Sequence, residues 1–315
     1  MQKKIDVSIV IANYNGSGMT KKCIGSIRKY TEKVNYEIIL IDDVSRMEDF
    51  SRLKSIKNVN LFRNDKNVGE LASKNKGIQK SKGKYIIICD NDILIEDNVI
   101  RKLFDYMEEN PEVGVTGLRL IFQDGSFQQS HGPMFIEPKK LIMNKISRVL
   151  HPRSKKLKKI DWISSFGADK SIHYTGHVKG AFCMIRREAI KKVGLMDEQY
   201  FVYADELDWQ HRMKKAGYDA VHLPFGPVIH FGGATNKSDI AGMMKWESHS
   251  LKNSILFCKK HHGTLNSIIY RIAMFFTLLV NIIRFKEKDK RKINGAMMKV
   301  LFKKVKNNPI EPRLE

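Results

Sequence analysis

Residues 85–92 read YIIICDND, an apolar run followed by Asp90, Asn91 and Asp92. A short apolar run that ends in a polar turn is typical of a buried strand. Asp90 and Asp92 are two positions apart, so on extended backbone their side chains point to the same side. Neighbouring carboxylates repel each other, and a divalent cation such as Mg²⁺ would remove that repulsion. The same residues are also compatible with an Asx-rich turn that only ends the strand.

Two earlier apolar runs also end in polar residues. Val7–Ala12 is followed by Asn13–Asn15, and Tyr36–Ile41 is followed by Asp42 and Asp43. The residues between the apolar runs have the hydrophobic spacing of helices. Strands that alternate with helices predict an α/β fold with a Rossmann-like, mostly parallel sheet flanked by helices. Ligands of such sheets bind beyond the carboxyl ends of the strands, so we expect the three polar clusters to meet in one crevice.

The cluster of Asp42, Asp43 and Ser45 has two interpretations. Its side chains could accept hydrogen bonds from a base or a ribose, or they could form a turn or the N-cap of a helix. Further strands are predicted at 59–62, 113–118, 180–186 and 220–223, helices at 70–79, 97–109 and 206–216, and a hairpin turn at 123–126. The region between is irregular and indicates an insertion beside the site.

Composition and charge narrow the choice of partner. The 315 residues suit about two domains, and 42% hydrophobic residues exclude a wholly disordered chain. The net charge of +22 is concentrated in residues 139–159, with nine Lys and Arg, and 284–306, with ten. Because the remainder is nearly neutral, the pattern favours a globule with two basic appendages that bind an anionic membrane, and no nucleic acid.

The four cysteines, Cys23, Cys89, Cys183 and Cys258, show no C-x-x-C spacing, which is typical of reduced thiols rather than of a zinc site or a disulfide framework. The run Val7–Ala12 is too short for the apolar part of a signal peptide. We therefore expect the catalytic part to lie in the cytoplasm.

Taken together, these stretches resemble a family 2 glycosyltransferase with a GT-A fold, most of all its bacterial rhamnosyltransferase-like branch. The resemblance covers about residues 5–260 and depends on the order and spacing of Val7–Gly16, Tyr36–Asp43, Asn67–Gly69, Gly83–Tyr85, Cys89–Asp92, Gly180–Ala181, Asp197–Glu198, Tyr203–Asp208 and Val228–His230. It implies an inverting, metal-dependent transferase that uses a nucleotide-sugar donor, a UDP- or dTDP-sugar, in the synthesis of surface polysaccharides.

The same resemblance implies which residues bind the donor. Ala12 and Tyr14 would line the nucleotide pocket, with Tyr14 stacking on the base. Asp42 would contact the base or the ribose, and Asn75 would lie near the ribose or the diphosphate. Asp90 counts both as a donor-binding residue and as part of the metal motif.

The resemblance also implies the metal ligands and the base. Asp90 and Asp92 form the metal motif for Mg²⁺ or Mn²⁺, with Asp92 the direct ligand and His230 completing the coordination. The general base lies in the pair Asp205 and Glu206, and Glu206 occupies the position of the base in the family pattern. A solvated acidic start of a helix is the alternative for this pair.

The C-terminal part predicts an amphipathic helix. In Leu265–Ile283 the polar residues, including Arg271, fall on one arc of about 140° at 100° per residue. We expect a catalytic domain over 1–260, with a basic insertion at about 137–160, and an amphipathic helix with a basic tail over 261–315. This tail would attach the protein to the inner face of the cell membrane, which suits a glycan or lipid-linked glycan acceptor. Packing on the catalytic domain or in a homo-oligomer is the alternative.

The sequence has two alternative interpretations. A sugar nucleotidyltransferase opens with a Gly-rich phosphate loop, whereas Asn13–Gly16 stands in that place here. A non-enzymatic basic protein that binds membranes or nucleic acid would not need acidic clusters at the ends of three strands.

Overall fold

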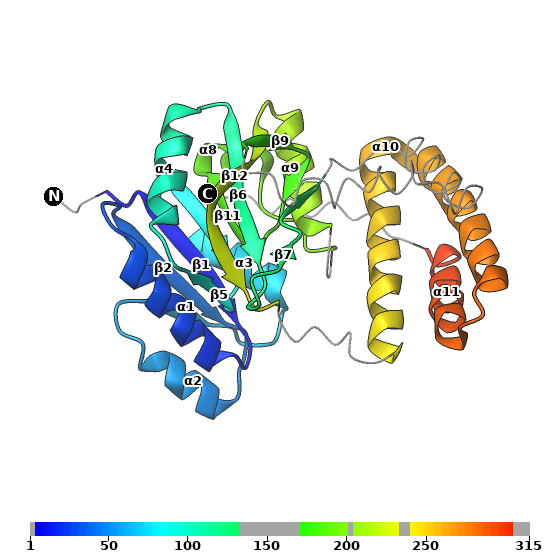
Figure 1. The fold of residues 1–315 in the computed structure, drawn as a ribbon, viewed down its shortest axis with the longest axis horizontal. Coiled ribbons are helices and arrows are strands. Elements are labelled where there is room, and N and C mark those ends of the chain that lie inside the picture. Colours follow the sequence, from blue (N-terminus) through cyan, green and yellow to red (C-terminus); the bar gives the residue numbers. More distant parts are fainter. Residues whose placement is uncertain (1–3, 133–170, 201–203, 233–239, 305–315) are drawn as a thin grey trace.

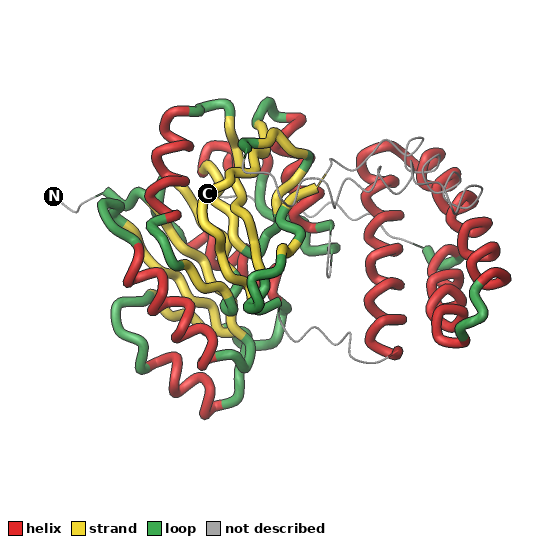
Figure 2. Tube along the Cα trace, in the orientation of Figure 1, coloured by secondary structure: helices red, strands yellow, loops and turns green. Residues whose placement is uncertain are grey.

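The computed structural model describes residues 4–132, 171–200, 204–232 and 240–304. A sheet with helices on both faces forms one part, and a group of C-terminal helices lies beside it (Figures 1 and 2). The basic segment expected at about 137–160 lies outside the described residues.

The strands are β1 (Val7–Asn13), β2 (Tyr36–Asp42), β3 (Asn60–Arg63), β4 (Tyr85–Cys89), β5 (Ile93–Ile95), β6 (Val113–Ile121), β7 (Phe127–Gln128), β8 (His131–Gly132), β9 (His173–Thr175), β10 (His177–Val178), β11 (Phe182–Arg186) and β12 (Asp219–His230). The helices are α1 (Ser17–Tyr30), α2 (Met47–Lys54), α3 (Glu70–Lys80), α4 (Val99–Glu109), α8 (Arg187–Val193), α9 (Asp205–Lys215), α10 (Ile240–Arg284) and α11 (Lys288–Leu301).

The main sheet has the strand order β3-β2-β1-β4-β11-β6-β12-β5. Strands β3, β2, β1 and β4 are parallel, β11 is antiparallel to both of its neighbours, and β12 is parallel to β6 but antiparallel to β5. The sheet is therefore mixed and mostly parallel, as the sequence predicts. The predicted turn at 123–126 joins β6 and β7 as an antiparallel hairpin.

Each face of the sheet has its own apolar core. On β4, Tyr85 and Ile87 face the core shared with α1, α2 and α4, whereas Ile86 and Ile88 face the core shared with α3, α8 and α9. Covering both faces explains why the strands are continuous apolar runs rather than alternating ones. Gly77 lets α3 approach β1, because a Cβ at this position would lie 2.3 Å from Cγ1 of Val10.

Two elements differ from the sequence-based expectation. The strand expected at 220–223 extends to His230 as β12, whose register shifts between Leu223 and Val228. Pro224 and Pro227 fall at this irregularity, since proline cannot donate to a neighbouring strand. Helix α2 has no counterpart among the predicted elements, and one fully buried residue, Leu53, fixes it to the sheet.

The C-terminal helices have a third apolar core of their own. Helix α10 breaks at Gly263, whose φ of 86° is favourable only for glycine. Both halves of α10 contribute to this core with α11, and Tyr200 and Leu207 join it from the sheet domain. Among the described residues the helical part begins at Ile240, because the first half of α10 packs with the second half, and the division expected at 260 stays a prediction.

Candidate active site

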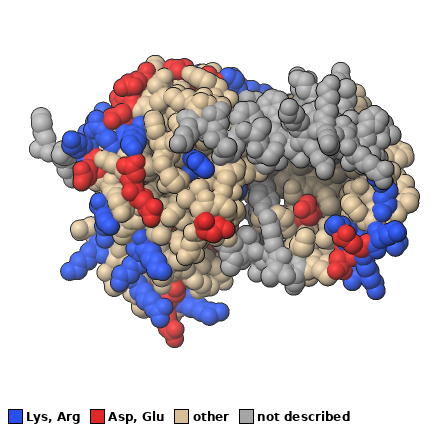
Figure 3. Space-filling view, viewed as in Figure 1, with Lys and Arg blue, Asp and Glu red and all other residues tan. Residues whose placement is uncertain are grey.

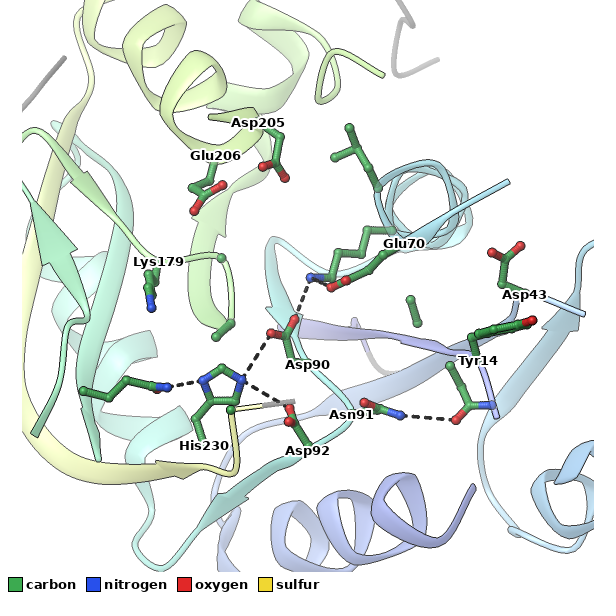
Figure 4. Close-up of a pocket in the computed structure, with 18 of the residues that line it drawn as sticks. Tyr14, Asp43, Glu70, Asp90, Asn91, Asp92, Lys179, Asp205, Glu206 and His230 are labelled. Atoms are coloured by element: carbon green, nitrogen blue, oxygen red, sulfur yellow. Dashed lines mark hydrogen bonds and ion pairs between the residues drawn. The ribbon is translucent and has the colours of Figure 1, made fainter. Parts of the chain in front are cut away.

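The turn after β4 and the end of β12 form an acidic site with one histidine (Figure 4). His230 is the last residue of β12 and pairs with Ile93 of β5, which places it beside the turn that carries Asp90 and Asp92. Nε2 of His230 lies 3.3 Å from Asp92 Oδ1 and 3.6 Å from Asp90 Oδ2. One ligand atom from each of the three residues fits within 4.8 Å, so the structure brings the expected metal ligands together.

The hydrogen bonding of His230 fits a cation. Its Nδ1 lies 2.7 Å from Oε1 of Gln128. Because an amide oxygen only accepts hydrogen bonds, Nδ1 carries the hydrogen, and the lone pair of Nε2 in the neutral ring faces the carboxylates. Three electron-rich ligand atoms in this arrangement suit Mg²⁺ or Mn²⁺.

A lysine of α3 completes the electrostatics of this site. Nζ of Lys74 lies 2.6 Å from Asp90 Oδ1 and 2.5 Å from Glu70 Oε1, one helical turn before it. Burial alone would lower the pKa of Lys74, but the charges of these two carboxylates raise it well above the ordinary value. The lysine is therefore charged and offsets part of the acidic charge.

The second acidic group lies in the first turn of α9. Asp205 and Glu206 follow Ala204, whose φ is 68°, and Figure 4 shows their carboxyl groups across the space from Asp90 and Asp92. Burial raises the pKa of Asp205, and the charge of Glu206 and the hydrogen bond between the two side chains raise it further. These effects favour the protonated form of Asp205.

These groups line one cavity of about 790 Å³. Its other lining residues come from the ends of β1, β2 and β6 and from α3 and α10, and the full set is Ala12, Asn13, Tyr14, Asp43, Glu70, Leu71, Lys74, Asp90, Asn91, Asp92, Phe122, Gln128, Gln129, Lys179, Gly180, Ala181, Asp205, Glu206, His230, Gly232 and Trp246. The three polar clusters therefore meet as the sheet topology predicts. Tyr14 is 59% exposed, so its ring is accessible at the cavity.

Asp42 is not in this cavity, which corrects the donor-binding expectation for it. Its side chain is fully buried, accepts hydrogen bonds from Asn13 and Ser45, and pairs with Arg63 at 3.5 Å. The next residue, Asp43, lines the cavity instead.

Asn75 is also absent from the cavity lining. Its amide nitrogen donates to Met196 O and Glu198 Oε1, each at 2.9 Å, and its oxygen accepts from Met196 N. These buried bonds tie α3 to the segment after α8. In the structure Asn75 therefore has a positioning role, and its expected contact with ribose or diphosphate stays a prediction.

Sequence reasoning did not single out several lining residues, among them Glu70, Lys74, Gln128, Lys179 and Trp246. Glu70 and Lys74 are four positions apart on the predicted helix, which indicates an ion pair but not its place in the fold. Lys179, Gln128 and Trp246 lie in or beyond the irregular region, where the sequence carries no periodic signal.

Comparison with known proteins gives the family. The model of the family described as glycosyl transferase family 2 matches residues 8–194. An uncharacterized glycosyltransferase of Rickettsia bellii is 36% identical over 129 residues, which is 39% of this chain and 18% of that protein. An N-acetylglucosaminyl-diphospho-decaprenol L-rhamnosyltransferase of Mycobacterium tuberculosis is 26% identical over 182 residues, 57% of this chain and 56% of that protein. The chain thus spans less than two thirds of the length of either relative.

Among solved structures, GalNAc-T7 with UDP, GalNAc and Mn²⁺ superposes with a TM-score of 0.58 at 17% identity, covering 96% of this chain and 56% of that one. This likeness shows the GT-A fold. Since the family match extends from β1 through β11 and α8 and includes the carboxylates after β4, the chain belongs to glycosyl transferase family 2.

Proposed function

We propose that this protein transfers a sugar from a UDP- or dTDP-sugar to a hydroxyl of a glycan or lipid-linked glycan acceptor, with inversion at the anomeric carbon, in the synthesis of bacterial surface polysaccharide. The mycobacterial relative is named for a decaprenol-linked acceptor, which supports a lipid-linked acceptor here. Family membership supports the reaction class.

One observation carries the proposal. Two acidic groups with different chemistry share one cavity: Asp90 and Asp92 with His230 on one side, and Asp205 with Glu206 on the other. A leaving diphosphate needs positive charge, and an attacking hydroxyl needs a base on the opposite side of the sugar. A cavity with a cation site facing a carboxylate base meets both needs at once.

The donor nucleotide fits the end of the cavity lined by Ala12, Tyr14 and Asp43. The exposed ring of Tyr14 offers a stacking surface for the base. Asp43 accepts hydrogen bonds from Asn64 and from the backbone of residues 68 and 69. A carboxylate has about four acceptor positions, so the three bonds among the described residues leave one for a ribose hydroxyl or a base nitrogen.

Asp90, Asp92 and His230 would hold Mg²⁺ or Mn²⁺, which when bound supplies Lewis-acid neutralisation of charge on the leaving diphosphate. Lys74 and Lys179 add positive charge from the chain itself. Glu206 takes the proton of the acceptor hydroxyl while the oxygen of that hydroxyl forms a bond to the anomeric carbon. The bond from that carbon to the phosphate oxygen breaks, and the nucleoside diphosphate leaves with the electron pair. Because attack and departure occur on opposite sides, the anomeric configuration inverts.

The test measures binding and transfer separately. A thermal-shift screen of UDP- and dTDP-sugars with and without Mn²⁺ identifies the donor, and NMR of the product gives its anomeric configuration. Glu206→Gln should lower turnover by about 10²–10⁴-fold, the usual contribution of a general base, while donor binding stays unchanged. Asp92→Ala should remove the effect of Mn²⁺ on donor binding.

Asp205→Asn tests the other carboxyl group of the pair: if Glu206 is the base, this variant keeps more turnover than Glu206→Gln. Full turnover by Glu206→Gln would place the base elsewhere. Donor binding that is indifferent to Mn²⁺ and Mg²⁺ in the wild-type protein would overturn the metal role of Asp90, Asp92 and His230.

A further inference from the structure

The second half of α10, residues 264–284, has two opposite faces. Ser267, Tyr270, Met274 and Leu278 are buried at intervals of three or four residues. The residues on the opposite face are large, apolar and exposed: Leu265, Ile268, Ile269, Ile272, Phe276, Leu279 and Ile283. At 100° per residue, these seven fall within an arc of about 100°.

The polar arc of this helix faces the protein rather than solvent. Arg271 donates to the carbonyl oxygens of Leu301 and Lys303 at the end of α11. Asn281 Nδ2 lies 3.3 Å from Oδ1 of Asn294 on α11. The amphipathic pattern predicted from the sequence is therefore present, but its polar side holds the helical part together and its apolar side is left outward.

The outward face is unusually apolar for an exposed surface. Leu265 is 70% exposed, Phe276 59% and Ile283 74%. Helix α10 contains a stretch long and apolar enough to cross a membrane by length and composition, and only 22% of that stretch is buried. Contiguous exposed apolar patches of this kind mark sites of contact with a protein or a membrane.

A transmembrane orientation conflicts with the packing of α11. The contacts from Arg271 to Leu301 and from Asn281 to Asn294 place α11 antiparallel against this half of α10. Helix α11 is rich in Lys and Arg, which a bilayer core disfavours. A helix that lies in the plane of the interface keeps α11 in water and still buries the apolar face.

The chain that follows the apolar face, through α11, is strongly basic. Between residues 284 and 304 the chain has two acidic residues and nine exposed Lys and Arg: Arg284, Lys286, Lys288, Lys290, Arg291, Lys292, Lys299, Lys303 and Lys304. Figure 3 shows such side chains at the right-hand end of the molecule, where Figure 1 places α11. A second copy of this chain would bring two such basic segments together, whereas an anionic lipid surface complements them.

We propose that the face formed by the seven apolar residues from Leu265 to Ile283 docks on an anionic phospholipid bilayer, with the helix parallel to the membrane plane. The apolar side chains enter the headgroup–acyl boundary, and the Lys and Arg of the segment 284–304 attract the anionic headgroups. The proposal concerns binding and does not depend on transferase activity.

The test is co-sedimentation of the full chain with vesicles of phosphatidylcholine alone and of phosphatidylcholine mixed with phosphatidylglycerol. The wild-type protein should bind the anionic vesicles, and the double variant Ile272→Ser, Phe276→Ser should lower the partition coefficient at least about tenfold. The double variant Arg291→Gln, Lys292→Gln should weaken binding to anionic vesicles by about fivefold for each charge removed. It should leave the affinity for phosphatidylcholine vesicles unchanged.

The matched control is the double variant Met47→Ser, Met243→Ser, which removes exposed apolar side chains from other surfaces and should bind like the wild type. Equal melting temperatures show that all variants are folded. Wild-type protein that stays in the supernatant with anionic vesicles overturns the proposal. So does an apolar-face variant that binds vesicles normally but changes a dimer into a monomer in analytical ultracentrifugation, which would assign the face to a second copy.

Discussion

Nζ of Lys74 lies 2.6 Å from Oδ1 of Asp90, so the first carboxylate of the acidic site has a cationic partner from α3. The lysine side chain is 9% exposed and also pairs with Glu70. It therefore offsets the repulsion among Glu70, Asp90 and Asp92 in the folded chain. The packing of α3 therefore depends on the charge state of the acidic site, because Lys74 pairs with Asp90.

We predict that Lys74→Met lowers the stability of the metal-free protein by about 1–3 kcal/mol, because Asp90 and Glu70 lose their shared partner. Added Mn²⁺ should then raise the melting temperature by more than it does in the wild type, since the cation replaces the missing charge. Differential scanning fluorimetry with and without MnCl₂ measures both effects. Lys80→Met, at an exposed position of the same helix, is the control. A Mn²⁺-induced shift no larger than that of the wild type would contradict the prediction.

Gln128 fixes the orientation of His230 through the 2.7 Å bond to Nδ1. Gln128→Leu keeps a similar volume but removes the acceptor, so the imidazole loses its preferred tautomer. We expect Mn²⁺ affinity to fall by about 10–100-fold. Isothermal titration with MnCl₂ measures the change, and Gln79→Leu, at an exposed position of α3, is the control. Unchanged affinity in Gln128→Leu would mean that His230 does not contact the metal.

Much of the site follows from strand order alone. Apolar runs bounded by polar turns identify β1, β2 and β4, and parallel pairing brings their carboxyl ends together. The position of Asp90 and Asp92 could therefore be predicted from periodicity. His230 lies on β12, far from them in the sequence, and only the family resemblance connects it to the metal motif.

The remaining details depend on packing that the sequence does not show. Asp42 and Asp43 are neighbours at the end of β2, and which of them enters the cavity depends on where the strand stops and the chain turns. The direction of β11 depends on the irregular region that connects it to β6. The sequence pattern therefore does not predict that β11 pairs antiparallel with its neighbours. Lys74 is one basic residue among several on α3, and only the docked helix directs it toward Asp90.

Asp205→Asn should stabilise the protein at neutral pH. Burial and the charge of Glu206 raise the pKa of Asp205 above its ordinary value of 3.8. The folded state then binds a proton that the unfolded chain releases, so this carboxyl group costs stability progressively as pH rises above that value. Asparagine is neutral at every pH and removes this cost. Melting temperatures from pH 5 to pH 8 should therefore show a variant advantage that grows with pH, and an advantage that shrinks would contradict the shift.

Three buried histidines should make the protein sensitive to acid. Burial lowers the pKa of His131 and of His211 from 6.5 to about 4, and that of His222 to about 3. Between these values and 6.5 the unfolded chain binds protons that the folded state does not, so stability is lost as pH falls through this range. Each histidine contributes roughly 2–4 kcal/mol by pH 4. Urea unfolding at pH 7, 6 and 5 measures the slope, which His222→Gln should reduce. An unchanged slope in this variant would show that His222 does not contribute.

Asp208 joins the helix that carries Glu206 to the C-terminal helices. The carboxyl group is fully buried, with Nε2 of His261 at 2.6 Å and Nζ of Lys260 and Nε of Arg212 each at 2.9 Å. Burial opposes ionisation, but the hydrogen bond from His261 and the two positive charges hold the pKa of Asp208 well below its usual range. The link between α9 and α10 is therefore an ionised carboxylate surrounded by donors.

Asp208→Asn should destabilise the protein by about 3–5 kcal/mol, because it leaves buried positive charges without their partner. Asp105→Asn, which breaks an exposed i,i+4 pair with Arg101, should cost less than about 1 kcal/mol. Limited proteolysis should also cut Asp208→Asn faster around Gly263, since α10 loses its attachment to α9 before the sheet domain unfolds. Equal losses of stability in the two variants, or an unchanged rate of cleavage, would show that the two parts are held together by the apolar core alone.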